Sequence, residues 1–409
     1  MDPNMMHSKF IDHCLTSGNP VVKILDLGQH AYADTFIRPD QLNLSEPVFP
    51  LHVYMNSTSG QIQLGYVSNA QDRYNLYSYS YTSSNSTFAR AHWDNYAHAI
   101  KKQFNPKGLV VEIGSNDGYL VKQFQQDDIR VLGIDSSESM CQIATEQGVT
   151  CVNEVFTQEV AQQVLAKYGK ASLVIANNVF NHANDPVNFA NGVRELLAPN
   201  GVFVFELPYW ADTVQSGRWD QIYHEHISYF TIKSSWHLLA RAGMHMINFE
   251  HVDYHGGSIR VMAMLGSTDQ IPAHIQSVID QETQQGLFDP TRYVQMQHDM
   301  IKHRDQWLEN FYKIRINEPD AVIIGVGAAA KANTWLTWHH LDYSVLHCIT
   351  DSSSHKQGKF TPLSRIPIHG DEEFAKYDQP YALILSWNIS AGLKSALLNI
   401  NPTIRFLTQ

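Results

Sequence analysis

The fold is decided by the stretch Val110-Val111-Glu112-Ile113-Gly114-Ser115-Asn116-Asp117-Gly118. It starts as an apolar, β-branched strand, reaches an acidic residue and turns through two glycines toward a helical pattern at 119–125. Strand, glycine turn and helix in this order are typical of a doubly wound α/β sheet. The alternation continues with strands at 130–134, 173–176 and 201–207 and helices at 139–147 and 186–197. We therefore expect a Rossmann-like parallel sheet.

The sequence on either side of this region predicts two further domains. Residues 1–90 contain short alternating pieces among Ser, Asn, Tyr and Gly, which indicates a small β-containing module. Residues 91–255 hold the α/β alternation. In residues 256–409, a polar helical stretch leads to an apolar strand at 321–324 and a second glycine turn, which predicts a C-terminal Rossmann-like α/β domain. Three domains suit a chain of 409 residues.

Composition excludes several classes of function. The chain is 44% hydrophobic and 17% charged, with 29 basic and 40 acidic residues and a net charge of −11, so nucleic-acid binding is not expected. Its apolar runs are much shorter than the roughly 20 residues that span a bilayer. The N-terminus lacks the basic-then-apolar order of a secretory signal, and four cysteines are too few for a disulfide framework. We expect a cytoplasmic protein without a membrane partner.

The glycine turn predicts a cofactor site. Its spacing, Glu112-x-Gly114-x-x-x-Gly118, differs from the G-x-G-x-x-G that cradles a pyrophosphate, and favours a cofactor without one, such as S-adenosylmethionine. Asp135 lies 21 residues beyond Gly114, at the end of the next expected strand. A carboxylate at this position can accept hydrogen bonds from ribose hydroxyls. The alternative is an ordinary strand-to-helix turn with a surface acid.

Two histidine-containing segments are candidates for catalysis. Asn178 and His182 follow a strand and are four residues apart, so on a helix they would share a face. In Tyr223-His224-Glu225-His226, an extended backbone would point alternate side chains to opposite faces, and a histidine there is a natural base near neutral pH. A capping or loop histidine is the alternative for the first segment, and a metal site for the second.

Three other segments could bind sugar or phosphate. The run Tyr77–Ser84 and the segment His255-Gly256-Gly257-Ser258-Ile259-Arg260 combine hydroxyls or an arginine with small residues. A polar edge strand is the alternative for the tyrosine run. The turn at Gly325 and Gly327 resembles a Rossmann NAD site, but Lys331 at the start of the following helix favours phosphate contact.

Six motifs together resemble the three-domain sugar-nucleotide C-methyltransferases that add branching methyl groups to deoxysugars. They are E-I-G-S-N-D-G-Y-L at 112–120, N-N-V-x-x-H at 177–182, Y-H-E-H-x-S-Y-F at 223–230, H-G-G-S-x-R at 255–260, G-A-x-A-K-x-N at 327–333 and H-K-Q-G-K-x-T-P at 355–362. The resemblance spans nearly the whole chain and implies a class I methyltransferase domain between the two outer domains.

The resemblance implies methylation of a dTDP- or GDP-linked 4-keto-6-deoxyhexose at carbon, expected at C-3, with S-adenosylmethionine as methyl donor. His226 would be the base and His182, held by Asn178, would assist beside Tyr223 and Glu225. The expected cofactor residues are Glu112, Gly114, Asn116, Gly118, Asp135 and Asn177, and the expected substrate residues are Tyr79, Tyr81, Ser83, Ser258, Arg260, Lys331 and Asn333. An O- or N-methyltransferase and an NAD-dependent oxidoreductase remain the alternative functions.

One departure from the family concerns zinc. Family members carry two C-x-x-C pairs in the N-terminal module, and the matching positions here are Cys14, Ser17, Asn56 and Ser59. Hydroxyl and amide groups are poor ligands for zinc. The sequence therefore predicts an N-terminal module that folds without metal.

Overall fold

The computed structural model describes residues 9–407 apart from 70–72, 74–83, 85 and 269. Its centre is a seven-stranded sheet in the order β12-β13-β10-β9-β6-β7-β8. The first five strands in sequence run parallel: β6 (Gly108–Ile113), β7 (Ile129–Asp135), β8 (Thr150–Asn153), β9 (Ala171–Ile175) and β10 (Leu197–Pro208). The last two, β12 (Met244–Val252) and β13 (Ser258–Leu265), are antiparallel to each other, and β13 is antiparallel to β10. The mixed α/β architecture that the sequence predicted is confirmed.

Helices of this domain bury apolar faces against the sheet. They are α2 (Thr87–Phe104), α3 (Tyr119–Lys122), α4 (Glu138–Glu146), α5 (Gln158–Tyr168), α6 (Pro186–Leu196), α7 (Trp210–Ser216) and α8 (Ile232–Arg241). Several begin where a side-chain oxygen accepts a backbone N–H, as Ser86 does at α2 and Asp185 at α6. Cys141 on α4 and Cys151 on β8 are joined by a disulfide that the cysteine count did not predict.

The N-terminal module is a four-stranded antiparallel sheet in the order β11-β4-β3-β2, with a separate β1–β5 pair. Its own strands are β1 (Lys9–Phe10), β2 (Val22–His30), β3 (Phe49–Asn56), β4 (Gln61–Leu64) and β5 (Tyr66–Val67). The strand β11 (Ser228–Tyr229) comes from the middle of the chain and pairs with β4. The segment just after Tyr223–His226 is thus built into the sheet of the N-terminal module.

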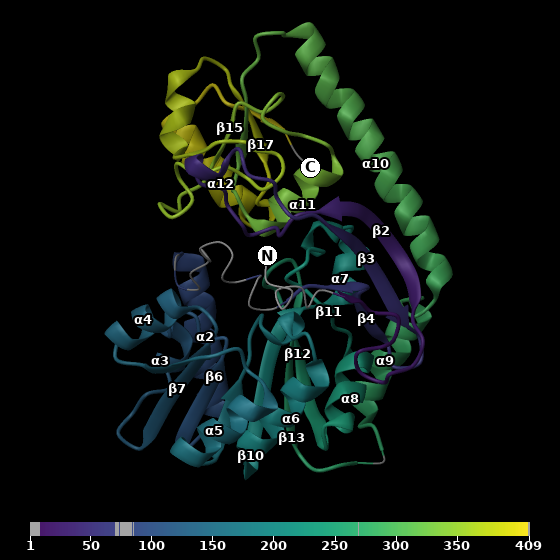
Figure 1. Cartoon of the computed structure of the whole chain (residues 1–409), viewed down its shortest axis with the longest axis vertical. Coiled ribbons are helices and arrows are strands. Elements are labelled where there is room, and N and C mark those ends of the chain that lie inside the picture. The colour runs from purple at the N-terminus through teal and green to yellow at the C-terminus, as the bar shows by residue number, and fades with distance from the viewer. Residues whose placement is uncertain (1–8, 70–72, 74–83, 85, 269, 408–409) are drawn as a thin grey trace.

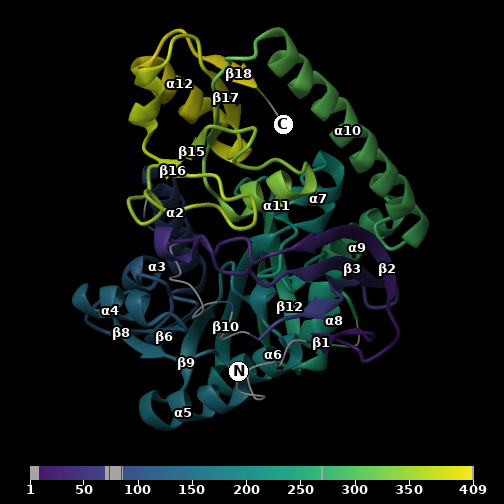
Figure 2. The ribbon, with the colours of Figure 1, turned by 45° about the horizontal axis from the view of Figure 1, so that its top comes forward.

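The C-terminal domain is a parallel five-stranded sheet in the order β16-β15-β14-β17-β18. A long helix, α10 (Pro290–Asn317), connects it to α9 (Ala273–Gln284) and runs along one side of the molecule past β2 (Figure 1). The remaining elements are β14 (Ile323–Val326), α11 (Ala330–Trp338), β15 (Cys348–Thr350), β16 (Ile368–His369), β17 (Tyr381–Ile384), α12 (Ser390–Ile400) and β18 (Arg405–Leu407). Figure 2 shows α11 at the end of this domain that faces the central one.

The domain boundaries differ from those expected. The boundary expected at 255 falls between β12 and β13, although the two strands pair along their whole length. The central domain therefore extends to Leu265. It also starts earlier than 91, because α2 begins at Thr87. The amphipathic pattern of a strand does not reveal which sheet the strand joins, so the sequence alone did not show that β13 pairs with β12.

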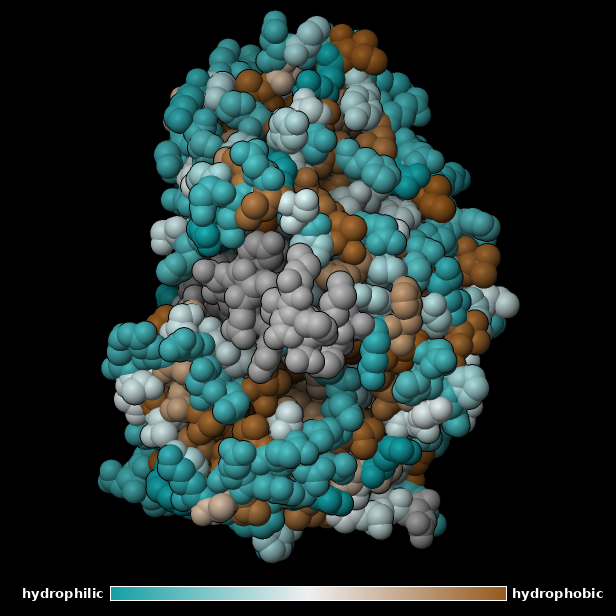
Figure 3. Space-filling view, viewed as in Figure 1, coloured by the Kyte–Doolittle hydropathy of each residue, from teal (hydrophilic) through white to brown (hydrophobic). Residues whose placement is uncertain are grey.

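The visible surface is mostly hydrophilic, with apolar residues scattered singly or in small groups (Figure 3). Within the described residues, no helix combines the length and apolarity needed to cross a bilayer.

Candidate active site

The loop that the sequence predicted to bind the cofactor follows β6 at the carboxyl edge of the central sheet. Gly114 and Gly118 have φ of 69° and 76°, and a Cβ on Gly114 would lie 2.7 Å from Val179, so glycine is required there. Asp135, at the end of β7, accepts the backbone N–H groups of Asn116 and Ser137, each at 2.8 Å. The expected residues Gly114, Asn116, Gly118 and Asp135 therefore meet at one edge.

Two of the expected cofactor residues also hold the scaffold. The buried carboxylate of Glu112 accepts the N–H of Val121 at 2.9 Å, and burial raises its pKa well above its ordinary value. Asn177 accepts the N–H of Glu206 at 2.9 Å and so ties the end of β9 to β10. Both side chains fix the geometry of the loops that line the edge.

His226 and His182 come together from separate loops. Their ring centroids are 5.1 Å apart. His226 Nδ1 lies 2.9 Å from the carbonyl oxygen of Gln221, and its Nε2 lies 2.8 Å from the hydroxyl oxygen of Tyr223. Because a carbonyl only accepts, Nδ1 carries the proton, and the lone pair of Nε2 accepts the Tyr223 O–H. Nε2 is thus the basic atom of this imidazole.

Burial keeps both histidines neutral. It lowers the pKa of His226 to about 4, with the nearby Lys331 ammonium acting in the same direction and the Gln221 carbonyl opposing it. The pKa of His182 is lowered well below its ordinary value by burial, by His226 and by Arg73. At neutral pH each ring therefore has an unprotonated nitrogen.

Glu225 and His224 contact the N-terminal module. Glu225 accepts the N–H of Asp34 at 3.1 Å, and burial raises its pKa to about 7. His224 Nε2 lies 3.3 Å from the carbonyl oxygen of Pro50, between the rings of Tyr32 and Phe49. The site thus joins the central domain to the N-terminal one.

Neither histidine segment has the helical or extended backbone that the sequence analysis considered for it. Residues 223–226 form a turn in which the N–H of His226 donates to the carbonyl of Tyr223, and this turn brings Tyr223 and His226 to the same side. Asn178 has φ of 52° and lies before the short 3-10 helix η3 (Phe180–His182), so it shares no helical face with His182. Its N–H donates to the Glu206 carbonyl instead.

The segment His255-Gly256-Gly257 closes the site from the side of the C-terminal domain. A Cβ on Gly256 would lie 2.4 Å from Trp387, and one on Gly257 would lie 2.1 Å from Asp212. His255 adopts φ of 54°, and burial lowers its pKa to about 3, with the nearby Lys331, His92 and His226 acting in the same direction. The sequence offered the whole segment from His255 to Arg260 as a candidate for sugar or phosphate binding, and that role stays a prediction.

Ser258 and Arg260 lie on β13 and not in a phosphate-binding loop. Ser258 donates to the Tyr254 carbonyl at 2.9 Å. The buried Arg260 guanidinium is ion-paired with Glu206 at 2.7 Å and with Glu250 at 3.1 Å. Its charge is already matched inside the central sheet by these two carboxylates, and the substrate contact expected of Arg260 stays a prediction.

Lys331 and Asn333 are placed by α11. Lys331 Nζ donates to Asn388 at 2.6 Å and lies 4.6 Å from the ring centroid of Trp387, whose indole N–H donates to Asp220 at 2.7 Å. Burial lowers the pKa of Lys331 to about 8, with the Asp220 carboxylate opposing that effect. Lys331 is also close enough to His226 and His255 to lower the pKa of each.

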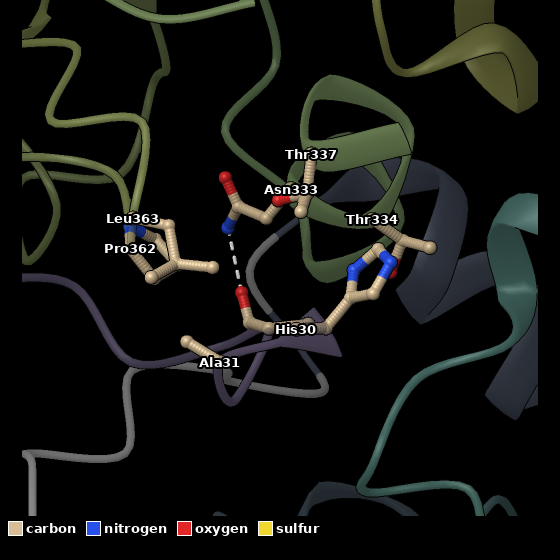
Figure 4. A pocket seen from close by; sticks show the side chains of 8 residues that line it. His30, Ala31, Asn333, Thr334, Thr337, Pro362 and Leu363 are labelled. Carbon is tan, nitrogen blue, oxygen red and sulfur yellow. Dashed lines mark hydrogen bonds between the residues drawn. The ribbon is translucent and has the colours of Figure 1, made fainter. Parts of the chain in front are cut away.

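Asn333 faces a small cavity between α11 and the N-terminal module (Figure 4). Its amide donates to the carbonyl of Ala33 at 2.6 Å, and His30, Pro362 and Leu363 line the same cavity. Asn333 thus joins two domains, which is a different role from the substrate contact that we expected. The expected substrate residues Tyr79, Tyr81 and Ser83 lie outside the described residues.

The four positions that match the family's zinc ligands do converge. Cys14 Sγ lies 3.4 Å from Ser59 Oγ and accepts the N–H of Ser17 at 3.3 Å, while Asn56 accepts the N–H and the hydroxyl of Ser59 at 2.9 and 3.0 Å. One thiol, two hydroxyls and an amide do not suit zinc. These residues do not fit the metal and instead form a hydrogen-bonded cluster.

Three family models match the chain in consecutive order. They are "Putative zinc binding domain" over residues 14–74, "Methyltransferase domain" over 87–248 and "C-methyltransferase C-terminal domain" over 253–402. The order agrees with the three domains of the structure.

Individual relatives give the same picture. The C-methyltransferase NovU of Streptomyces niveus is 32% identical over 281 residues, an alignment that covers 68% of this chain and 66% of that protein. Solved structures similar to the chain include the PH0226 protein of Pyrococcus horikoshii (17% identity, TM-score 0.37, covering 45% of this chain and 94% of that one). Another is the magnesium protoporphyrin IX methyltransferase of Synechocystis (17%, TM-score 0.34, 43% and 83%). Such distant likenesses carry no functional argument. The ordered domain matches and the relative at 32% identity show that the chain is similar to C-methyltransferases, and its alignment spans 66% of that relative's length.

Proposed function

We propose that this protein transfers a methyl group from S-adenosylmethionine to a carbon atom of a nucleotide-linked 4-keto-6-deoxyhexose, at C-3. The proposal rests on one observation above all: two neutral histidine rings lie 5.1 Å apart, and Val179, in the same loop as His182, packs against Gly114 of the glycine turn that Asp135 adjoins. Similarity to a C-methyltransferase and to the C-methyltransferase C-terminal domain supports methylation at carbon. S-adenosylmethionine, when bound, supplies an electrophilic methyl group.

His226 is the proposed base. A 4-keto group acidifies the adjacent C–H, and His226 Nε2 would accept that proton once Tyr223 gives way or relays it. The low pKa of His226 makes its imidazolium form unfavourable by itself, but the proton would arrive as negative charge develops on the enolate oxygen. The two opposite charges then stabilise each other in a buried site.

His182 is the proposed partner of that enolate oxygen. Its ring adjoins His226, so one substrate can contact both. The enolate carbon forms the new C–C bond with the methyl group while the C–S bond breaks, and S-adenosylhomocysteine leaves. Positioning and a ready base are what the chain contributes. Glu225 holds the segment of His226 against the N-terminal module.

Lys331 is the proposed contact of the C-terminal domain with the diphosphate. Lys331 carries a compact positive charge at the start of α11. This charge lowers the pKa of both His226 and His255, so the ammonium lies near both rings.

The test is incubation with S-adenosylmethionine and a panel of dTDP- and GDP-linked 4-keto-6-deoxyhexoses, followed by mass and NMR analysis. A new methyl group on C-3 supports the proposal. A methyl group on oxygen or nitrogen would refute it, and so would absence of transfer across the panel with NADH bound in place of S-adenosylhomocysteine.

A further inference from the structure

Arg73 connects the N-terminal module to the loop that carries His182. It is 3% exposed. Its Nη1 donates to the carbonyl of Ser68, just after β5, at 3.0 Å. Its Nη2 donates to the carbonyl of His182 at 3.1 Å and to the side chain of Asn184 at 2.7 Å. One guanidinium therefore holds two domains together beside the candidate active site.

The loop around His182 is fixed by several of these contacts at once. The N–H of His182 donates to Val179, its carbonyl accepts from Arg73, and Asn184 donates to the same Ser68 carbonyl at 3.0 Å. Directly after Asn184, Asp185 caps α6. The backbone of His182 is thus restrained on both sides, and the arginine supplies the restraint that comes from another domain.

The oxygens of Ser68, His182 and Asn184 that accept hydrogen bonds from Arg73 are neutral, and the charge of Arg73 acts on titratable groups of the site. It disfavours protonation of His182 and His224 and favours the ionised form of Glu225. Burying a cation is costly unless its N–H groups are hydrogen-bonded. The planar guanidinium of Arg73 can donate to three oxygens that lie in two directions, whereas the single ammonium group of a lysine could not reach all three.

We propose that Arg73 is a positioning residue for His182: its guanidinium fixes the loop that holds this imidazole beside His226. The inference rests on the proposed function, in which His182 contacts the developing enolate. It adds a residue from outside the six motifs that identified the family, on the far side of a domain boundary from the ring that it positions.

The experiment compares Arg73→Ala and Arg73→Lys with Arg130→Ala, a matched control. Arg130 is an exposed arginine that donates to one carbonyl, that of Tyr168, away from the site. We expect Arg73→Ala to lower kcat for the active sugar nucleotide by about 10²-fold, the loss typical of a misplaced catalytic group, with KM and S-adenosylmethionine affinity almost unchanged. Methylguanidinium should restore part of kcat to Arg73→Ala and none to Arg130→Ala.

Arg73→Lys keeps the charge and is the variant to use if Arg73→Ala fails to fold. It should lose kcat without rescue by methylguanidinium. An NMR readout is independent of turnover: the ring signal of His182, assigned with His182→Ala, should shift in the Arg73 variants and stay in place in Arg130→Ala.

The inference is overturned if a folded Arg73 variant keeps wild-type kcat and an unchanged His182 signal, even when its melting temperature falls. A parallel measurement on His182→Ala distinguishes failure of the role proposed for His182 from failure of the positioning role proposed for Arg73. If His182→Ala keeps full kcat, the role proposed for His182 is wrong; if it loses kcat while the Arg73 variants do not, only the positioning role is wrong.

Discussion

The hydroxyl of Tyr223 lies 2.8 Å from Nε2 of His226, and the carbonyl of Gln221 lies 2.9 Å from Nδ1 of the same ring. These two contacts fix the tautomer of the imidazole. They also place the basic lone pair of His226 Nε2 against the Tyr223 O–H. In the proposed reaction, this hydroxyl either moves aside for the substrate or relays the proton to Nε2. The pair is created by the turn at 223–226.

His226→Ala is expected to lower methyl transfer by about 10²–10⁴-fold, because it removes the base, while both ligands remain bound. Tyr223→Phe should have a smaller effect, since Nε2 remains. Rates are measured by product mass spectrometry and binding by calorimetry. If His226→Ala still exchanges the sugar C–H with solvent deuterium at the normal rate, the base lies elsewhere, with His182 next.

Glu225 should make stability depend on pH. Burial raises its folded pKa to about 7 from an ordinary 4.5, so its contribution is present at low pH and is lost as pH rises through 7. Glu225→Gln removes this loss. Relative to wild type, it should gain up to about 3 kcal/mol of unfolding free energy between pH 5 and pH 8.

Denaturant unfolding at the two pH values measures this difference. Glu309→Gln, an exposed change beside Lys313, serves as the control and should show no such gain. A pH-independent difference for Glu225→Gln would mean that the carboxyl ionises normally in the folded chain.

Asp135→Ala should weaken S-adenosylmethionine binding by about 1.5–3 kcal/mol, the value of a hydrogen bond to a charged group. The carboxylate lies at the cofactor edge and also holds Asn116 and Ser137. Calorimetry with Asp128→Ala, an exposed aspartate paired with Lys107, provides the control. Unchanged affinity in Asp135→Ala would contradict the assignment of the cofactor loop.

Lys331→Ala should raise the KM for the sugar nucleotide and leave cofactor affinity unchanged, because its proposed contact is remote from the reacting carbon. Lys394→Ala, on the outer helix α12, is the matched control. An effect confined to cofactor binding would refute the proposed division of labour between the domains.

The N-terminal module should contain well under one zinc per chain when purified without added metal. The donors at Cys14, Ser17, Asn56 and Ser59 hydrogen-bond to one another and do not suit zinc. Elemental analysis and melting with and without a chelator check this. Stoichiometric zinc, or a melting temperature lowered by the chelator, would show that other ligands bind the metal.

The sequence by itself determined the local features of this protein. The α/β sheet and the edge expected to bind the cofactor were predicted from the apolar strand before Gly114, the glycines that follow it and the acid Asp135. These signals are readable in the sequence because strand alternation and glycines with positive φ depend on residues only a few positions apart. The six motifs similarly brought His226, His182 and Tyr223 into one hypothesis before any distance was known.

Only the tertiary structure decided which side chains meet. In the folded chain, Arg260 forms an ion pair with Glu206, and β13 lies between β10 and β12. Tyr223 contacts His226, and Arg73 donates to the carbonyl of His182. Nothing local marks Arg73, whose acceptors at His182 and Asn184 are more than a hundred residues away. Such contacts depend on the packing of whole domains: a buried charge takes the partners that the fold brings to it, and sequence spacing does not encode them.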